Sequence, residues 1–155
     1  MNKLLLSAGL LLMLLPLPGW TAGDDILGVW NTAEGRSRVE VSNCGDRYCG
    51  RIIWLKEPNY PPNDKQGMAG QVKVDRKNPD PQLRTRALLG LEILKDFHYD
   101  GTQWTDGTIY DPKKGKTYRC KITQVDNGTL NVRGYIGISL IGRSTQWTRF
   151  TENPK

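Results

Sequence analysis

The sequence contains a single histidine, His98, and only three cysteines. A Ser-His-Asp triad, a Cys-His pair or a zinc site would have to be built on that one imidazole. No serine elbow motif, histidine cluster or spare pair of thiolates accompanies it. We therefore expect no catalytic residue, no metal and no cofactor. An enzyme would have only Asp75, Asp80, Arg84 and Tyr110 as a polar constellation.

Long apolar runs are also scarce, because only residues 4–17 form one. This run follows Lys3, contains proline and leads into small residues at 21–23, which is the pattern of a secretory signal. A retained membrane anchor is the alternative, but the run is shorter than the roughly 20 residues that a spanning helix requires. We expect a signal peptide over residues 1–23 and one domain over residues 24–155. The mature protein is expected to be periplasmic or secreted, with no transmembrane segment after cleavage.

Acidic residues are in the minority. Without Lys3, the chain has 21 basic residues against 16 acidic ones. The surplus favours anionic partners such as lipopolysaccharide, anionic lipid or nucleic acid, but it is spread along the chain, which indicates a solvated basic surface. We expect no nucleic-acid partner, because export removes the usual one and the expected strand count is too high for an open five-stranded barrel of that kind.

Two of the three cysteines are close in sequence. Cys44 and Cys49 bracket four residues, and a hairpin turn on those residues brings the two sulfur atoms within bonding reach. Oxidising compartments favour such pairing, so we expect a disulfide between them. Cys120 lies in an alternating strand, which predicts a small buried thiol. A reactive thiol, the alternative, would need a nearby histidine or basic cluster to activate it.

Helical periodicity is nearly absent, whereas short alternating runs separated by turn residues recur from residue 26 onward. Such a pattern is typical of an all-β barrel or sandwich. Turn signals such as Asn127-Gly128 indicate that most connections are hairpins. Eight antiparallel strands joined in order can close into an up-and-down barrel that holds one small ligand. The expected strands cover residues 27–32, 36–42, 48–55, 89–99, 103–110, 116–124, 129–136 and 142–150.

The alternation breaks between the third and fourth of these strands. Residues 56–81 carry five prolines and form a long connection, which in a compact domain is usually functional or mobile. Asp80-Pro81 is typical of a helix start, so we expect a short helix over residues 81–87. Asp75, Asn78 and Asp80 offer oxygen ligands to calcium, but the glycine and terminal glutamate of a calcium loop are missing. Local turn and cap hydrogen bonds are the preferred interpretation.

Several separated segments resemble, in the same order, a family of small exported bacterial proteins that is catalogued as a domain of unknown function. Gly28-Val29-Trp30 on the first strand, together with Arg149 on the last, also resembles the calycins, and the lipocalins in particular. The resemblance implies a lipocalin-like barrel in which Trp30 packs at the closed end and Arg149 crosses over it. It implies a bacterial, exported setting and no established reaction. The other segments are Cys44-Gly45, Cys49-Gly50-Arg51-Ile52, Asp75 with Asn78-Pro79-Asp80, Leu83-Arg84-Thr85-Arg86 leading to Gly90, 107–112 and 133–138.

Candidate ligand-binding residues are aromatic side chains on the expected strands and two arginines at the end of the connection. The aromatic side chains either line a small-molecule cavity or fill a core, and both interpretations stay open. The arginines either aim a guanidinium at a ligand carboxylate or phosphate, or pair with Asp75 and Asp80 to staple the connection. The candidates are Arg84, Arg86, Trp54, Trp104, Tyr110, Tyr118 and Tyr135.

These features predict an exported, non-catalytic barrel that binds a small apolar or amphipathic molecule, fatty-acid-like in character. The alternative is a filled barrel that serves as a protein-interaction module of the cell envelope. In that case the contact surface is the apolar tip between the last two strands, because Ile138, Leu140 and Ile141 would be unusual there unless they packed inward or met a partner.

Overall fold

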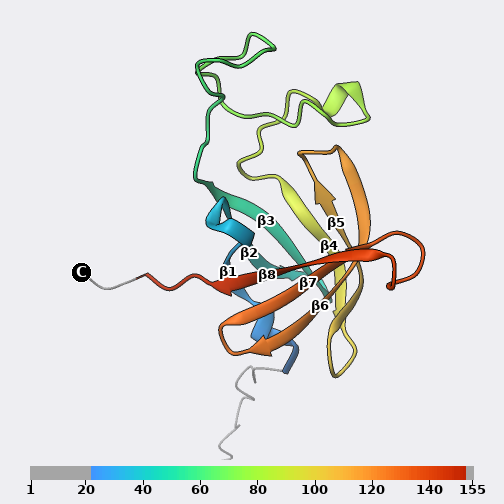
Figure 1. The fold of residues 1–155 in the computed structure, drawn as a ribbon. Coiled ribbons are helices and arrows are strands. Elements are labelled where there is room, and N and C mark those ends of the chain that lie inside the picture. Colours follow the sequence, from blue (N-terminus) through green and yellow to red (C-terminus); the bar gives the residue numbers. More distant parts are fainter. Residues whose placement is uncertain (1–21, 153–155) are drawn as a thin grey trace, which may run out of the picture.

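The computed structural model describes residues 22–152, so the expected signal peptide lies outside the described residues except for Ala22 and Gly23. Eight strands pair in sequence order and close into one antiparallel barrel (Figure 1). This confirms the predicted all-β fold. The strands are β1 Gly28–Asn31, β2 Ser37–Cys44, β3 Arg47–Leu55, β4 Glu92–Tyr99, β5 Trp104–Asp111, β6 Lys116–Asp126, β7 Thr129–Tyr135 and β8 Gly142–Arg149.

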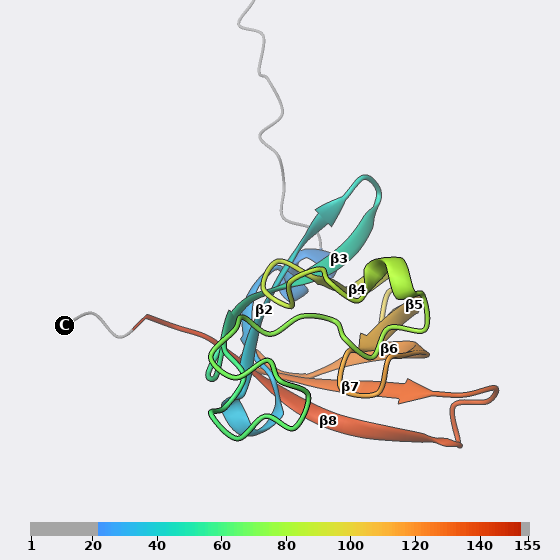
Figure 2. The ribbon, with the colours of Figure 1, turned by 90° about the horizontal axis from the view of Figure 1, so that it is seen from above.

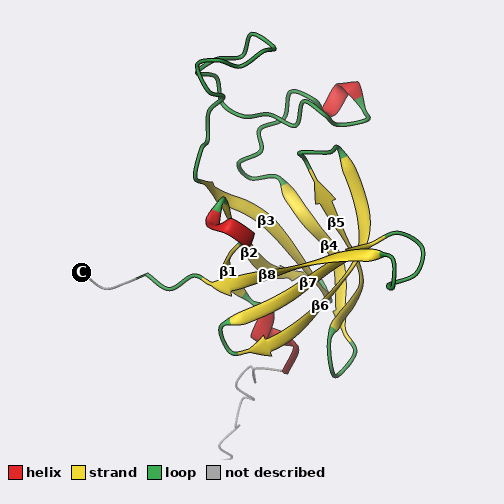
Figure 3. Ribbon diagram, viewed as in Figure 1, coloured by secondary structure: helices red, strands yellow, loops and turns green. Residues whose placement is uncertain are grey.

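Helical structure in the described part of the chain is limited to three short 3₁₀ turns, η1 Ala22–Ile26, η2 Ala33–Gly35 and η3 Pro81–Leu83 (Figure 3). The helix expected over residues 81–87 is therefore much shorter than predicted. Asp80 starts it as expected, since its side chain accepts a hydrogen bond from the backbone of Gln82. The chain then becomes extended, because Ala87 pairs with Val74 of the same connection.

The barrel interior is filled toward the end that η1 covers, here called the closed end. Phe97 is 1% exposed, and its ring packs directly against Gly107. A Cβ atom on Gly107 would lie only 2.4 Å from the Phe97 ring. Large side chains occupy the rest of this region and are less than 2% exposed; they include Trp30, Trp104, Leu94, Ile122, Leu130 and Val132.

Two indole groups hold η1 in place. Trp30 Nε1 donates a hydrogen bond of 2.8 Å to the carbonyl oxygen of Ile26, and Trp104 Nε1 donates one of 2.9 Å to that of Gly23. Both tryptophans are fully buried, so each N–H group would be costly without an acceptor. The backbone of η1 supplies these acceptors and seals the closed end at the same time.

Arg149 completes the closed end from the last strand. It pairs with Trp30 across the β1–β8 seam, and its guanidinium carbon lies 4.2 Å from the centroid of the Trp30 ring. The same guanidinium donates hydrogen bonds to the carbonyl oxygens of Leu27 at 2.9 Å and Asp25 at 2.6 Å. Gly28 leaves room for it, since a Cβ atom there would lie 3.1 Å from Arg149 Nη1. This is the arrangement that the lipocalin resemblance implies.

Arg149→Ala is expected to lower the free energy of unfolding by about 1–3 kcal/mol, because it removes the cation–π contact and the bonds to carbonyl oxygens. Thermal denaturation measures the change. Arg51→Ala, which removes an exposed arginine of β3, serves as the control and should leave the melting temperature nearly unchanged. Ligand affinity should not change, and a selective loss of binding at unchanged stability would contradict a purely structural role for Arg149.

The connection between β3 and β4, residues 56–91, stands over the end opposite η1, as the view from above shows (Figure 2). Two isolated bridges, Asn59 with Val72 and Val74 with Ala87, join its segments to one another. An ion pair also links two parts of the connection, because Nη1 of Arg76 lies 2.8 Å from Oδ1 of Asp64. No helix among residues 22–152 is long and apolar enough to cross a membrane.

Candidate functional site

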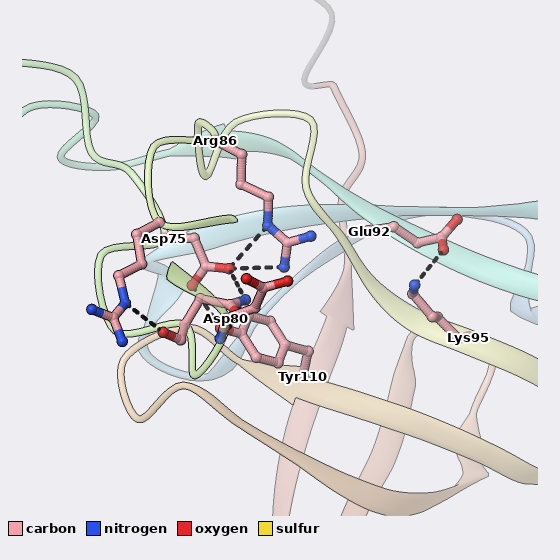
Figure 4. A network of polar contacts seen from close by, with 8 residues as sticks. Asp75, Asp80, Arg86, Glu92, Lys95 and Tyr110 are labelled. Atoms are coloured by element: carbon pink, nitrogen blue, oxygen red, sulfur yellow. Dashed lines mark hydrogen bonds and ion pairs between the residues drawn. The ribbon is translucent and has the colours of Figure 1, made fainter. Parts of the chain in front are cut away.

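A buried carboxylate organises the base of the connection. Asp75 is 0% exposed, and its Oδ2 atom accepts hydrogen bonds from Nε and Nη2 of Arg86 at 3.0 and 2.8 Å (Figure 4). The same oxygen accepts a bond of 2.7 Å from the side-chain amide of Asn78. The other oxygen, Oδ1, accepts a bond of 2.6 Å from the hydroxyl group of Tyr110. Every oxygen of this carboxylate is therefore engaged, as a buried charge requires.

Tyr110 joins this network to the barrel, because it belongs to β5 and its hydroxyl group reaches the connection. The hydroxyl also accepts a bond of 3.1 Å from Asn78 Nδ2. Burial, followed by the hydrogen bond to Asp75, raises the pKa of Tyr110 to about 12. The phenol therefore stays protonated at physiological pH and remains a donor to Asp75. Its ring also lies 5.7 Å from the guanidinium carbon of Arg86.

Arg84 and Asp80 lie beside this network with other partners. Arg84 Nε donates to the backbone carbonyl of Asn78 at 2.8 Å, and Asn78 Oδ1 accepts from the backbone of Asp80 at 2.9 Å. Of the two arginines, only Arg86 pairs with a carboxylate, and that carboxylate is Asp75. Pairing with a carboxylate thus describes Arg86. The Arg84 side chain instead holds the loop by its hydrogen bond to the backbone carbonyl of Asn78. The Asx-turn and cap bonds preferred for this segment are present.

An open pocket of about 290 Å³ lies on the other side of Arg86. Its polar lining comes from Arg86, Lys95 and Glu92, and Lys95 Nζ lies 3.5 Å from Oε1 of Glu92 (Figure 4). Its apolar lining comes from Leu89 and Leu91, and Leu89 is 54% exposed. The Arg86 guanidinium keeps one nitrogen, Nη1, with no hydrogen bond to any described residue. The pocket is therefore amphipathic and has two cations at its edge.

Sequence reasoning did not find Lys95, Glu92 or Leu89. A β-bulge at Ile93 shifts the register between β3 and β4, so that Glu92 lies opposite the exposed Arg51. The strand was predicted to begin at residue 89, whereas residues 89–91 belong to the pocket wall. Simple alternation of apolar and polar residues reveals neither the register shift nor the later start of the strand. The only usable signal is that Lys95 and Glu92, three residues apart, interrupt an otherwise apolar strand start.

The aromatic candidates do not converge on one cavity. Trp104 is part of the filled closed end, whereas Tyr118 faces inward beside Gly134 and is only partly buried. Trp54 lies on the outer face, where the guanidinium carbon of Arg38 is 4.4 Å from its ring centroid. Tyr135 is also outside, opposite Arg119 in the register of β6 and β7. The structure thus brings together Arg86 and Tyr110 and leaves the other candidates apart.

A one-residue shift explains the position of Trp54. Arg38 pairs with Trp54, but the next residue, Val39, pairs with Ile52, so Ile53 is the extra residue of a β-bulge. An inserted residue changes which face the following side chains occupy. Val39 and Ile52 point into the core, and Trp54 ends on the face of Arg38.

The cysteines behave as predicted. Cys44 and Cys49 form a disulfide at the β2–β3 hairpin, which confirms that prediction. Cys120 is 0% exposed, and burial raises the pKa of its thiol to about 12, so it stays protonated at neutral pH. Within residues 22–152, no three His, Cys, Asp or Glu side chains are grouped in a way that suits a metal ion.

His98 occupies a second open pocket, together with Asp46, Arg47 and Asp106. Its Nδ1 atom lies 3.2 Å from Oδ2 of Asp106, close enough for an ion pair but not aligned as a hydrogen bond. No serine or cysteine lines this pocket. It does not hold the parts of a nucleophilic triad.

A closed antiparallel barrel of eight strands, with a Trp–Arg pair at one end and a long connection over the other, defines a lipocalin-like protein. Protein HP1028 from Helicobacter pylori, whose structure is described as belonging to the lipocalin family, is similar. It shares 25% sequence identity with a TM-score of 0.67, over 82% of this chain and 84% of that chain.

Residues 28–149 match the family described as "Uncharacterized protein conserved in bacteria (DUF2147)". The chain belongs to this family. Both comparisons confirm the resemblance found in the sequence. Comparison with curated proteins gives no match.

Proposed function

We propose that this protein is an exported carrier or sensor that binds a small amphipathic anion, fatty-acid-like in character, without transforming it. The observation that carries the proposal is the pocket beside Arg86, in which cations and exposed leucine surface lie together. Ligand pockets are typically apolar with a few placed polar groups. The H. pylori protein of similar structure is described as a lipocalin, which supports a binding role.

Arg86 is suited to fix an anionic head group. Two of its nitrogens are held by Asp75, which orients the guanidinium, and Nη1 is left to donate a charge-assisted hydrogen bond. Lys95 supplies a second positive charge, partly balanced by Glu92. Leu89, Leu91 and Ala87 then offer apolar surface to a hydrocarbon chain. At about 290 Å³ the pocket favours a short or medium chain.

Binding without chemistry is supported by the state of the reactive groups. The phenol of Tyr110 and the thiol of Cys120 both have their pKa raised to about 12, so neither supplies an anionic nucleophile at neutral pH. Asp75, one of the four residues that an enzyme would have had to use, already accepts four hydrogen bonds. Export is supported by the Cys44–Cys49 disulfide, since oxidising compartments preserve such bonds.

Calorimetric titration with sodium decanoate tests the pocket. Lys95→Gln is expected to weaken binding about 5-fold or more, because it removes one cation from the pocket edge, and Leu89→Ser should weaken it by a similar factor. Lys65→Gln, at an exposed lysine of the connection outside the pocket, is the matched control and should bind as the unaltered protein does.

Two results would overturn the proposal. One is an absence of decanoate binding together with no small molecule retained in native mass spectra of protein purified from its own periplasm. The other is equal affinity in Lys95→Gln, Leu89→Ser and the Lys65→Gln control, which would place the ligand elsewhere. Lys95→Gln and Leu89→Ser each change an exposed side chain, so both variants are expected to fold and both results remain interpretable.

A further inference from the structure

The turn between β7 and β8 exposes four aliphatic side chains. Ile136, Ile138, Leu140 and Ile141 are 65%, 60%, 84% and 67% exposed. In two perpendicular views the β7–β8 hairpin reaches outward past the other strands (Figures 1 and 2). Residues 136–141, here called the tip, therefore present apolar surface away from the barrel. Contiguous exposed apolar surface of this kind marks an interaction site.

Hydrogen bonds hold the tip in a defined conformation. Arg133 donates hydrogen bonds to the carbonyl oxygens of Ser139 at 2.7 Å and Leu140 at 3.2 Å. The backbone of Ile136 also donates to Ile141, and that of Ile141 to Ile138. These bonds fix the turn with its aliphatic groups pointing out, so little ordering would be needed on binding.

The positive charge of the chain gathers on the same part of the barrel. Residues 112–151, which include β6, β7 and β8, contain eight Lys or Arg residues and one acidic residue, Asp126. Asp126 is the last residue of β6 and precedes the turn into β7. That turn lies at the end of β7 opposite the tip. The positive surplus, which was expected to be spread along the chain, is therefore concentrated in this one segment.

Three cations of this region stand close to the tip in the register of the strands. Arg119 pairs with Tyr135, Lys121 with Arg133, and Arg143 with Gly134. Among the described residues, none of these three side chains forms an ion pair with a carboxylate. They remain available to an external anion.

We propose that the tip inserts into the surface of an anionic phospholipid bilayer. The aliphatic side chains would enter the boundary of the acyl chains, while Arg119, Lys121 and Arg143 meet the lipid phosphates. Interfacial binding depends on this combination of buried apolar area and attraction to anionic lipid. A nucleic acid would use the cations but has no place for four exposed aliphatic groups. The hairpin that carries the tip protrudes from the barrel (Figures 1 and 2), which suits insertion into a lipid surface. This surface is separate from the Arg86 pocket and goes beyond the proposed function.

Co-sedimentation with phospholipid vesicles tests the proposal. The full mature protein is mixed with vesicles of phosphatidylcholine alone or with 30% phosphatidylglycerol at about 0.1 M salt. Binding is expected only to the anionic vesicles and should weaken as salt rises, because salt screens exposed charges. The double variant Leu140→Ser/Ile141→Ser should lower the partition coefficient about 10-fold or more. Arg119→Gln/Arg143→Gln should lower it on anionic vesicles as well.

The matched control is Val125→Ser, which removes an apolar side chain that is 57% exposed near the opposite end of β6. It should bind as the unaltered protein does. Leu140→Trp adds a reporter whose emission should shift to the blue on anionic vesicles.

The proposal is overturned if anionic vesicles fail to retain the protein, or if the tip variants and Val125→Ser bind equally. It is also overturned if the unaltered protein is a dimer in solution and Leu140→Ser is a monomer, since the tip would then belong to a second copy. Decanoate binding by the tip variants should be unchanged, so failure here and failure of the pocket are told apart.

Discussion

Asp75→Ala is expected to weaken the attachment of the connection to the barrel by about 3 kcal/mol. The change removes a buried carboxylate and leaves Arg86, Asn78 and the hydroxyl of Tyr110 without their shared acceptor. Breaking one side of a buried ion pair typically costs about 3–5 kcal/mol, and the lower value applies because Arg86 retains some contact with water.

Hydrogen exchange provides the measurement. The amides of Asp75 and Leu88 donate to the carbonyl oxygens of Arg86 and Lys73 inside the connection. Opening should become about 100-fold more frequent in Asp75→Ala, and exchange of these amides should accelerate in proportion. Strands of the barrel should exchange at nearly their original rates, because the connection can open while the barrel stays closed.

Asp80→Ala is the matched control for this prediction. Asp80 is exposed and accepts one bond, from the backbone of Gln82, as the cap of η3. Its loss should cost about 1 kcal/mol and accelerate exchange less than about 10-fold. Similar rates in the two variants would show that Asp75 is no more important than a surface cap.

Trp104→Ala is expected to lower the free energy of unfolding of the whole barrel by about 3–5 kcal/mol. It opens a large cavity at the closed end and deprives the carbonyl of Gly23 of its indole donor. In a domain of this size the melting temperature should fall by roughly 10 °C or more. Urea unfolding, followed by circular dichroism, gives the free energy directly.

A second tryptophan provides the control. Trp54→Ala removes a ring of similar size from the outer face, where it stacks with Arg38, and should cost only about 1 kcal/mol. Trp104→Phe retains most of the buried surface and should fall between the two. Equal losses for Trp54→Ala and Trp104→Ala would contradict the assignment of inner and outer faces.

Alternation and turn residues were sufficient to predict the barrel, because its strands follow one another through mostly short turns. Cys44 and Cys49 were predictable for the same reason, since the hairpin that joins them is local. The positions of Trp54 and Glu92 were not, because each lies next to a β-bulge, at Ile53 and at Ile93, that alternation does not reveal. A single extra residue reverses the face of every side chain beyond it.

The site was harder to predict than the fold because its contacts are long-range. Asp75 and Arg86 are eleven residues apart, but Tyr110 reaches Asp75 from 35 residues away, on another element. Local patterns indicated only that Asp75 and the arginines belong to one polar segment. Likewise, η1 owes its position to Trp104, which is 81 residues from Gly23 in sequence.

The β1–β8 seam sets the order in which this barrel can be completed. It has two paired positions, Trp30 with Arg149 and Asn31 with Thr148, whereas β2 and β3 pair along eight. Hairpins form from neighbouring residues, but the seam must wait until both ends of the chain are present. Until then β1 and β8 are open sheet edges, which invite pairing with other chains. Arg149 donates hydrogen bonds to the backbone ahead of β1 and so stabilises the closed seam against that aggregation-prone state.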